Sequence, residues 1–516
     1  MEGTLSTKDY IHFKVLDNQN NCIWEGNECH RLFNGDRVRI LENQSIEPIE
    51  KLKRKNIVGI LLTSSKIRHG IDKRGNIVYI FRPIDMSYPE FLVASSLKNQ
   101  IANQWCVIDF LDWTVDSKRP RGAIQTYLGK VGIYEVELEA VYKHYRPKTI
   151  ENKHWRTNYE PQVQDIIHRY QKNDWKQTRQ YIKDYTVSID PDGCEDIDDA
   201  FSFKRLGKNL WQIIIHISDV SYWIPANSPL DIIAEHLGST LYGTNKNFPI
   251  FPRELSCGIF SLQKDQLRTT LSLSITLDKM QIIDHSFNQT IIKNNASLTY
   301  DNYRNETNID WSNLYECVEV LAKELKLPTI QDDSHKLIET LMIYYNHYVA
   351  NMGSCIYRIQ STKMSDNSDR EEYPNELKFL NLESAEYSLQ SEKHYCLGLN
   401  SYTHATSPIR RYADILVQRY LLNISQVSMA TILELNRLQK LAKRFHRDIQ
   451  FIRAIYENVE RIVDAIVLDN DYVYIMDWGQ KVRFKNEIEK YSKIQLHFYV
   501  DPNPIQWKKK IIFQQS

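Results

Sequence analysis

A short acidic stretch most strongly constrains how this chain can fold. Residues 188–203 read SIDPDGCEDIDDAFSF and hold six carboxylates within ten positions, between two runs of apolar and small residues. The apolar flanks indicate that the stretch enters a core, where uncompensated carboxylates would repel one another and lose their hydration. A divalent cation is the usual means of holding several anions together. The alternative interpretation is a solvated acidic loop, the ordinary setting of such clusters.

The donor atoms narrow the choice of metal. Oxygen ligands favour Mg²⁺, Mn²⁺ or Ca²⁺, but a calcium loop starting at Asp190 would need Gly at its sixth position and Glu at its twelfth, and neither is present. In an extended segment Asp196 and Asp198 point the same way, and a turn at residues 191–193 brings Asp190 to the same ion. The stretch therefore predicts a magnesium site. Two ions about 4 Å apart would suit phosphodiester hydrolysis.

A second stretch, YTHATSPIRRYADILVQRY at residues 402–420, supplies cationic groups. Thr406 or Ser407 is predicted to cap a helix that Pro408 begins. Arg410 would then bind a phosphate near the helix N-terminus. Taken alone, the pattern fits better an ordinary capped amphipathic helix whose paired arginines are solvated.

The rest of the chain divides by its hydrophobic pattern. Residues 1–150 hold short β-branched and aromatic runs between polar turns, which predicts two small barrels of about five strands each. YEVELEAVY at residues 134–142 continues this strand-like rhythm. The polar, roughly helical stretch at 151–184 predicts a linker with helices.

Beyond the acidic stretch we expect a mixed region. Residues 209–224 and 267–278 predict buried strands, and residues 334–353 predict a long helix that Gly353 ends. After residue 462 the strand pattern returns, with a hairpin turn at residues 470–471.

Composition limits where the protein works and what it binds. Lys plus Arg equals Asp plus Glu, 65 against 65, so a nucleic-acid partner would need a local basic groove. The eight cysteines form no C-x-x-C pair, which argues against a zinc ribbon or a disulfide framework and predicts free thiols in a reducing compartment. No secretory signal and no apolar run of about 18 residues is present, so we expect a cytoplasmic, soluble protein without a membrane partner.

Together the two stretches resemble the two signatures of the ribonuclease II superfamily, whose catalytic region is the RNB domain. Residues 188–200 are similar to the first signature, an Ile-Asp-Pro followed by a spaced Asp-x-Asp-Asp-Ala, and residues 402–419 match the second nearly throughout. Their order and separation also agree with the family. The superfamily includes ribonuclease II, ribonuclease R and the catalytic subunit of the exosome.

The resemblance implies a multidomain α+β architecture. LFNGDRVRI at residues 32–40 resembles the first cold-shock domain, residues 119–142 the end of the second, and residues 461–484 a shortened S1 domain. All three are OB-type β-barrels, which suit single-stranded RNA. No PIN segment precedes residue 1, so a PIN-mediated exosome tether is not expected, and we expect a monomer. The implied domains are cold-shock domains at 1–65 and 66–150, the helical linker at 151–184, a mixed α/β RNB catalytic domain at 185–460 and a short S1-like domain at 461–516.

The family's functional residues transfer position by position. The four matching aspartates imply a Mg²⁺ site, with Mn²⁺ as a substitute and two ions when substrate is bound; Asp198 is the one expected to be catalytic. Arg410 matches the arginine that holds the scissile phosphate, and we expect Arg411 to contact RNA beside it. Tyr242 matches the tyrosine that packs on the terminal bases and sets the end-product length. Tyr300 matches a further active-site tyrosine, with a core aromatic as the alternative for both. The four aspartates are Asp190, Asp196, Asp198 and Asp199.

The implied activity is magnesium-dependent, processive 3′-to-5′ hydrolysis of single-stranded RNA to nucleoside 5′-monophosphates. One alternative is a catalytically weak RNA-binding protein with the RNB fold, which loss of any of the four aspartates would have supported. A second is a metal-dependent phosphatase or endonuclease of unrelated fold, against which the second signature and the barrels argue. The chain departs from the family at His446, near which a Glu is common, and in the polar segment at 361–379.

Overall fold

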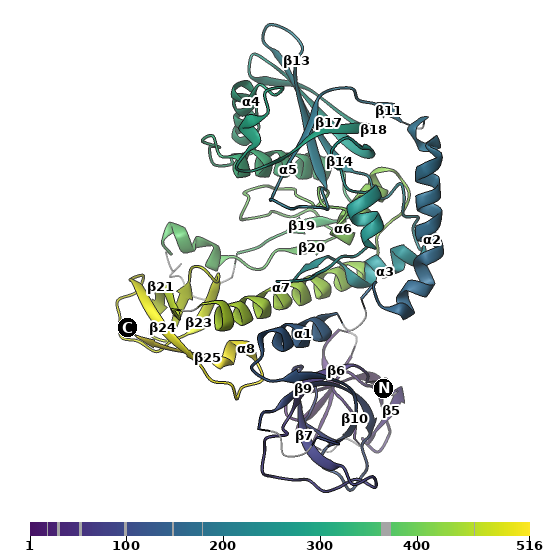
Figure 1. Ribbon diagram of the computed structural model, residues 1–516, viewed down its shortest axis with the longest axis vertical. Helices are drawn as coiled ribbons and strands as arrows, with labels where there is room; N and C mark the ends of the chain where they lie inside the picture. The colour runs from purple at the N-terminus through teal and green to yellow at the C-terminus, as the bar shows by residue number, and fades with distance from the viewer. Residues whose placement is uncertain are drawn as a thin grey trace. The chain divides into compact units, whose positions relative to one another are not determined.

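Two sets of β-strands form the N-terminal region of the computed structural model (Figure 1). The structure describes residues 1–17, 19–27, 31–50, 54–97, 101–146, 149–177, 179–362, 373–458 and 460–515. The first set is a sheet in the order β3-β2-β1-β4-β5, and the second is a closed barrel in the order β10-β8-β7-β6-β9. The strands are β1 (Glu2–Thr7), β2 (Phe13–Leu16), β3 (Cys22–Gly26), β4 (Arg37–Ile40), β5 (Ile46–Glu50), β6 (Ile57–Leu61), β7 (Ile77–Pro83), β8 (Phe91–Ser95), β9 (Gln104–Asp112) and β10 (Arg121–Lys130).

The predicted boundary after residue 65 is wrong, because β6 belongs to the second barrel. All five residues of β6 are buried, and the strand pairs with both β7 and β9. Strand pairing on both edges places β6 inside the second barrel. The boundary between the two β-structures therefore lies between β5 and β6.

The strand predicted at residues 134–142 is instead part of helix α1 (Tyr134–Tyr145). Gly132 ends the preceding strand at a φ of +93°, a conformation that favours glycine. The helix buries Leu138, Val141, Tyr142 and Tyr145, a spacing of three and four residues that only a helix places on one face. The alternation in the sequence was compatible with either period, and tertiary packing selected the helical one.

The C-terminal strands form a sheet in the order β23-β22-β21-β24-β25. The predicted turn at residues 470–471 joins β21 to β22 and is confirmed. By contact clustering this sheet belongs to one unit with the N-terminal β-structures, made of residues 1–148 and 444–516. Its elements are β21 (Ile462–Asp469), β22 (Tyr472–Ile475), β23 (Gln480–Arg483), β24 (Lys493–Val500), the short helix α8 (Trp507–Lys510) and β25 (Ile511–Gln515).

A buried carboxylate ties this C-terminal segment to the barrel. Glu137 on α1 is fully buried; it accepts hydrogen bonds from Trp507 Nε1 at 2.7 Å and the Gly132 N–H at 2.8 Å, and pairs with Lys510 Nζ at 3.3 Å. The Trp507 ring stacks on Trp105 of β9, with centroids 5.6 Å apart. Lys510, the last of the three lysines of α8, is therefore buried in an ion pair.

Replacing Glu137 by Ala should destabilise this unit by about 3–5 kcal/mol, because Lys510 would remain buried without its partner. Urea unfolding followed by tryptophan fluorescence measures the change. Glu139→Ala is the matched control: it removes an exposed carboxylate of the same helix and should change the free energy of unfolding by less than about 0.5 kcal/mol. Equal effects of the two substitutions would contradict the assignment.

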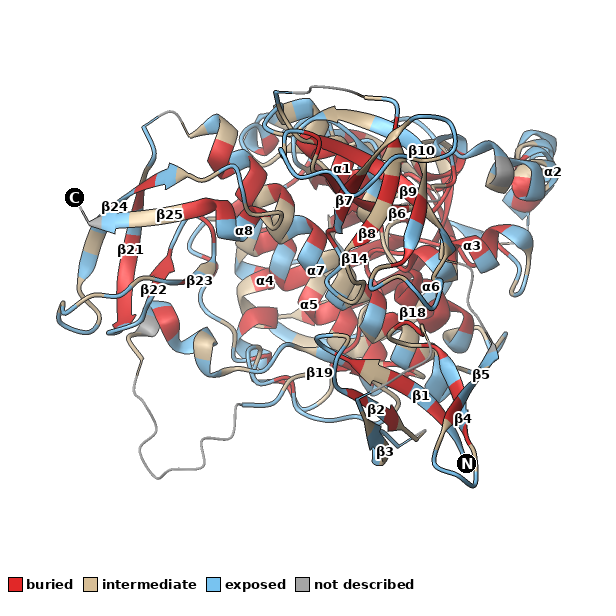
Figure 2. Cartoon of the chain, turned by 90° about the horizontal axis from the view of Figure 1, so that it is seen from below, coloured by how far each residue is buried: buried red, intermediate tan, exposed pale blue. Residues whose placement is uncertain are grey.

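The second unit, residues 149–443, begins with helix α2 (Lys153–Lys172) and a short turn of helix, η1 (Asp174–Gln177). We expected only a linker here. Instead Tyr159, Val163, Ile166 and Trp175 are buried in the main hydrophobic core of the unit, while the outward side of α2 is exposed (Figure 2). The segment is helical, as predicted, but it is part of the second unit because its apolar side is buried there.

The centre of this unit is a six-stranded sheet in the order β11-β18-β12-β13-β14-β17, in which β18 also pairs with β17. Five of the strands therefore close into a ring. Both predicted buried strands are present, as β14 and β17. The strands are β11 (Gln180–Tyr181), β12 (Thr186–Asp190), β13 (Asp199–Arg205), β14 (Leu210–Ser218), β17 (Leu267–Asp278) and β18 (Gln281–Thr299).

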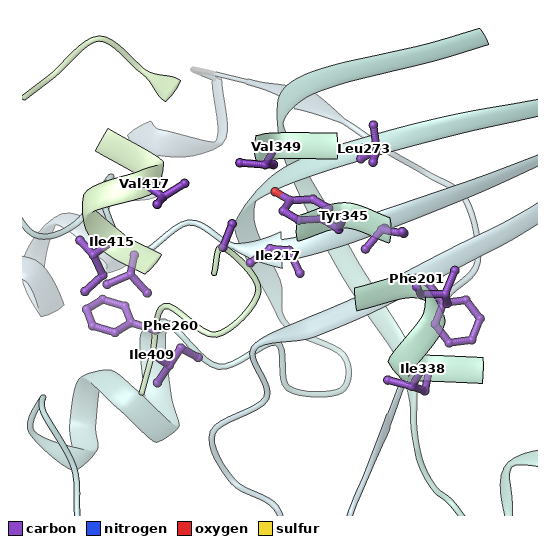
Figure 3. Close-up of a cluster of buried hydrophobic side chains, with 14 of the residues drawn as sticks. Phe201, Ile217, Phe260, Leu273, Ile338, Tyr345, Val349, Ile409, Ile415 and Val417 are labelled. Atoms are coloured by element: carbon purple, nitrogen blue, oxygen red, sulfur yellow. The ribbon is translucent and has the colours of Figure 1, made fainter. Parts of the chain in front are cut away.

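The two faces of this sheet differ in polarity. On one face Ile217 and Leu273 join Tyr345 and Val349 of α5 in the apolar core (Figure 3). On the other face the wholly buried His216 hydrogen-bonds to side chains of neighbouring strands, Ser202 at 3.0 Å and Ser272 at 2.6 Å. Burial lowers the pKa of His216 to about 3, so the ring is neutral.

The remaining elements surround this sheet. Helix α5 is the long helix predicted, and Gly353 follows it at a φ of +97°. The predicted end of the RNB region at residue 460 is wrong, since α7 contributes its residues from Arg444 onward to the other unit. The elements are α3 (Pro229–Leu237), β15 (Leu241–Tyr242), β16 (Asn247–Phe248), η2 (Glu254–Ile259), η3 (Tyr303–Asn305), α4 (Trp311–Glu324), α5 (Ser334–Asn351), β19 (Tyr357–Ile359), η4 (Asn375–Asn381), β20 (Glu386–Ser388), α6 (Tyr412–Leu421) and α7 (Met429–Glu457).

Two further expectations concern cysteines and membranes. The cysteines within the described ranges are free thiols, as predicted, and Cys29 lies outside those ranges, as do residues 363–372 of the unmatched polar segment. None of the helices described above is long and apolar enough to cross a membrane.

Candidate active site

The acidic stretch forms the connection between β12, which ends at Asp190, and β13, which begins at Asp199. The predicted turn at residues 191–193 is confirmed: the Cys194 N–H donates to the Pro191 carbonyl at 3.1 Å. Gly193 has a φ of +74°, the left-handed conformation that the third residue of such a turn requires. The turn brings Asp190 back beside the residues that follow it.

The second stretch folds differently from the prediction. Helix α6 begins only at Tyr412, and its N-cap is Arg411 in an extended conformation without a side-chain cap. Extended pairing delays the helix, because the Thr240 N–H donates to the Arg410 carbonyl and the Tyr412 N–H donates to the Gly238 carbonyl, both at 2.9 Å. Thr406 and Ser407 therefore do not cap the helix, and Pro408 does not begin it.

The two stretches meet at Asp198 and Arg410. The Arg410 Nε donates to one carboxylate oxygen of Asp198 at 3.0 Å, and the Ile409 N–H donates to the other at 2.8 Å. Asp198 is only 4% exposed. Burial raises the pKa of Asp198 to about 7, against the opposing influence of the Arg410 charge and the Ile409 N–H. Burial alone would lower the pKa of Arg410, but the Asp198 carboxylate raises it above its ordinary value.

A second carboxylate that the sequence analysis missed holds the Arg410 turn in place. Asp414 is fully buried and accepts the Ser407 N–H at 2.7 Å and Arg411 Nη2 at 2.9 Å. The Ser407 hydroxyl in turn accepts Arg410 Nη2 at 2.8 Å. Arg411 thus points to Asp414, away from Asp198, and its contact with RNA remains a prediction. A lone Asp within the apolar run ADILV was the signal that could have identified Asp414.

One cavity of about 930 Å³ gathers most of the predicted site residues. The four aspartates line it from the end of β12, the connection that follows and the start of β13. Tyr242 of β15, Tyr300 just after β18, and Arg410 before α6 complete this group. The structure therefore brings together every predicted site residue except Arg411.

Burial and neighbouring negative charges both disfavour the ionised forms of these carboxylates. Burial, with the Asp196 charge, raises the pKa of Asp190 to about 6. Burial together with the charges of Asp190 and Asp198 raises the pKa of Asp199 well above its ordinary value. The Oδ2 atom of Asp190 is buried and has no hydrogen-bond partner among the described residues. A buried carboxylate oxygen without a donor is poorly solvated and has the character of a metal ligand.

These donors fit a hard divalent cation. They are all oxygens, carry concentrated negative charge, and include the unpartnered oxygen of Asp190. As they stand, no three carboxylate, imidazole or thiol side chains of the described residues are arranged to enclose a metal ion. The hydrogen bonds of Asp198 to Arg410 and Ile409 contribute to this arrangement. The fit therefore rests on donor chemistry and charge.

Both predicted tyrosines line the cavity, and Tyr300 also packs against the main hydrophobic core. Tyr242 is 38% exposed, and its hydroxyl donates to Asp196 Oδ2 at 2.9 Å. The Tyr300 ring lies flat on the His335 ring, with centroids 3.9 Å apart and planes 9° apart. Burial raises the pKa of Tyr300 to about 12, so its hydroxyl remains a donor at neutral pH.

Comparison with known proteins agrees with this geometry. The RNB domain model matches residues 179–309 and 359–426, and the Dis3-like cold-shock domain 2 (CSD2) model matches residues 78–146. The chain therefore contains a region that matches the RNB domain. The match spans both signature stretches, and it confirms the resemblance and the multidomain α+β fold inferred from them.

The individual proteins that this chain resembles are distant in sequence. The chain is 26% identical over 326 residues to ribonuclease R 1 of Lactococcus lactis, which covers 48% of the chain and 40% of that relative. The chain thus aligns with less than half of that protein. RNase R of Mycoplasma genitalium has the same fold, with a TM-score of 0.76 at 16% identity over all of both chains. Yeast Ssd1, a pseudonuclease, matches with a TM-score of 0.64 at 15% identity, covering 97% of this chain and 80% of that one.

The raised pKa of Asp190 predicts how stability depends on pH. Because the folded pKa, about 6, exceeds the unfolded value of about 4, the contribution of Asp190 to the stability of the metal-free chain is greatest below pH ~4 and is lost as the pH rises through ~6. Asp190→Asn removes this loss. In EDTA it should stabilise the protein at pH 8, by up to about 3 kcal/mol, and change little at pH 4, as measured by chemical denaturation.

Asp192→Asn is the matched control, since Asp192 is exposed on the same turn and should show no such pH dependence. An equal stabilisation by Asp190→Asn at pH 4 and pH 8 would show that the effect does not come from ionisation.

Proposed function

We propose that this protein is a magnesium-dependent exoribonuclease that hydrolyses single-stranded RNA processively from its 3′ end and releases nucleoside 5′-monophosphates. The observation that carries the proposal is the contact of Asp198 with Arg410, since it joins the two signature stretches inside the cavity that the other three aspartates line. RNase R of Mycoplasma genitalium, which shares the fold, has been solved with single-stranded RNA. We expect the protein to act as a cytoplasmic monomer.

The four aspartates would hold the metal. When bound, Mg²⁺ supplies an activated water and stabilises the charge that develops on the leaving oxygen. Asp190 offers a buried oxygen that has no hydrogen-bond partner among the described residues. The negative charge of Asp190 raises the pKa of the neighbouring Asp199 carboxyl, so a bound cation would stabilise both groups. Asp196 is oriented by the Tyr242 hydroxyl. Mn²⁺, which accepts the same oxygen donors, is a suitable substitute.

Arg410 is positioned to bind the scissile phosphate. Its bonds to Asp198 and Ser407 fix the plane of the guanidinium group, while its side chain stays 43% exposed where it lines the cavity. A guanidinium held in one plane can bind two phosphate oxygens at once. The rigid turn that Asp414 secures keeps this group beside the carboxylates.

The tyrosines supply contacts to the end of the RNA. Tyr242 presents a half-exposed ring to the cavity, and rings of this kind stack on unpaired bases with little sequence preference. Tyr300 offers a hydroxyl whose proton is retained at neutral pH. Hydrogen bonds to the ribose 2′-hydroxyl are what distinguish RNA from DNA in such a site.

A catalytically weak RNA-binding protein is the second candidate. Yeast Ssd1, a pseudonuclease, shares the fold, and fold alone does not decide activity. Retention of all four aspartates and Arg410 in one cavity favours the enzyme.

A time course on 5′-labelled RNA tests the proposal. With Mg²⁺ the unsubstituted protein should shorten single-stranded RNA in steps of one nucleotide from the 3′ end, and EDTA should stop the reaction. Asp198→Asn should slow degradation by at least about 10²-fold, the usual effect of removing a central electrostatic group, while RNA binding persists.

Asp192→Asn, in the same loop, should leave the rate unchanged. Binding without degradation by the unsubstituted protein would support the second candidate, and cleavage of a circular RNA would indicate an endonuclease.

The length of the final oligonucleotide tests Tyr242. If its ring packs on the terminal bases, Tyr242→Ala should change the end-product length, whereas Tyr242→Phe, which keeps the ring but loses the bond to Asp196, should keep it. Tyr420 is the control, since it is a similarly exposed tyrosine that does not line the cavity. A denaturing gel resolves the products, and an unchanged ladder for Tyr242→Ala would remove the residue from this role.

A further inference from the structure

Two cations besides Arg410 line the active-site cavity. Lys246 lies in the β15–β16 hairpin and Arg253 immediately precedes η2, and their side chains are 47% and 70% exposed. Among its described lining residues the cavity has seven carboxylates and three cations. A polyanion that enters must therefore overcome net repulsion, so the position of every lining cation matters.

Each of these two cations is paired with a glutamate, and neither is paired with one of the four aspartates. Lys246 Nζ is 3.2 Å from the Glu151 carboxylate, and Arg253 pairs with Glu195. The Lys246 ammonium also lies 5.4 Å from the centroid of the Phe248 ring. All four residues line the same cavity, and both glutamates are more than half exposed.

Exposed ion pairs of this kind contribute little stability and exchange readily. A phosphodiester offers an arginine two oxygens in the geometry of a carboxylate, and it offers a lysine a full negative charge. Phosphate can therefore take the place of Glu151 or Glu195 without a change in backbone.

We propose that Lys246 and Arg253 bind backbone phosphates of single-stranded RNA as it approaches Arg410, and that these phosphates displace Glu151 and Glu195. The inference rests on the proposed function and adds the residues that guide the substrate. In the absence of RNA the two glutamates hold the cations away from the catalytic aspartates, which would otherwise attract them.

The proposal predicts opposite signs for the two halves of each pair. Removing a cation should weaken RNA binding, whereas removing its glutamate should strengthen binding because the phosphate no longer has a competitor. If Glu195 served as a metal ligand instead, Glu195→Gln would weaken magnesium-dependent degradation and would not tighten RNA binding.

The test measures RNA binding in the Asp198→Asn background, so that substrate is not consumed. Fluorescence anisotropy of a labelled single-stranded oligoribonucleotide gives the affinity between about 50 and 200 mM KCl. Lys246→Gln and Arg253→Gln should each reduce affinity about threefold to fivefold, and each should flatten the plot of log affinity against log salt by about 0.7. Glu195→Gln and Glu151→Gln should each raise affinity.

Arg437→Gln is the matched control, because Arg437 is an equally exposed, glutamate-paired arginine of the same unit that does not line the cavity. It should change neither affinity nor slope. Unchanged slopes for Lys246→Gln and Arg253→Gln, or weaker binding after Glu195→Gln, would overturn this inference even if the unsubstituted protein degrades RNA. Failure of the unsubstituted protein both to bind and to degrade RNA would instead reject the proposed function.

Discussion

The second unit depends on the ion pair between the buried Asp198 and the half-exposed Arg410. It joins a connection between two strands to a turn more than 200 residues later, and the Ile409 N–H completes the solvation of the carboxylate. A carboxylate that is only 4% exposed would carry a heavy desolvation cost without these donors. Asp414 supports this contact from outside the cavity. It accepts a hydrogen bond from the Ser407 N–H and so holds the turn that carries Ile409 and Arg410, the two donors to Asp198.

Apolar packing fixes the positions of the two segments that make this polar contact. Ile409, in the same turn as Arg410, lies near Phe260 and Ile415 in the core. In the same core Ile217 of β14 lies beside Tyr345 of α5 (Figure 3). The strand ends that carry the aspartates and the turn that carries Arg410 therefore share one core. Because interiors are close-packed, a shift of one segment would require the others to move. Burial in this core raises the pKa of both Asp190 and Asp198.

Where the sequence-based predictions failed, local pattern and tertiary context favoured different structures. Residues 134–142 alternate as a strand would, but their burial has helical spacing. Thr406, Ser407 and Pro408 have the composition of a helix start, yet residues 408–410 form a separate turn, and Arg411 is extended and bridges to Ser239, so the helix begins only at Tyr412. The segment at 151–184 is polar enough to be a linker, but the apolar residues of one side are buried in the core.

The sequence by itself determined the acidic and arginine-rich signatures, and with them the family, the four aspartates and the tyrosines of the site. These follow from residue types at fixed local spacings, such as the turn at Gly193, which short-range geometry specifies. Only the tertiary structure decided that Asp198 meets Arg410 and that Lys246 and Arg253 are paired with glutamates. Such contacts join residues far apart in the chain, so they depend on how the strands and helices pack and not on local spacing.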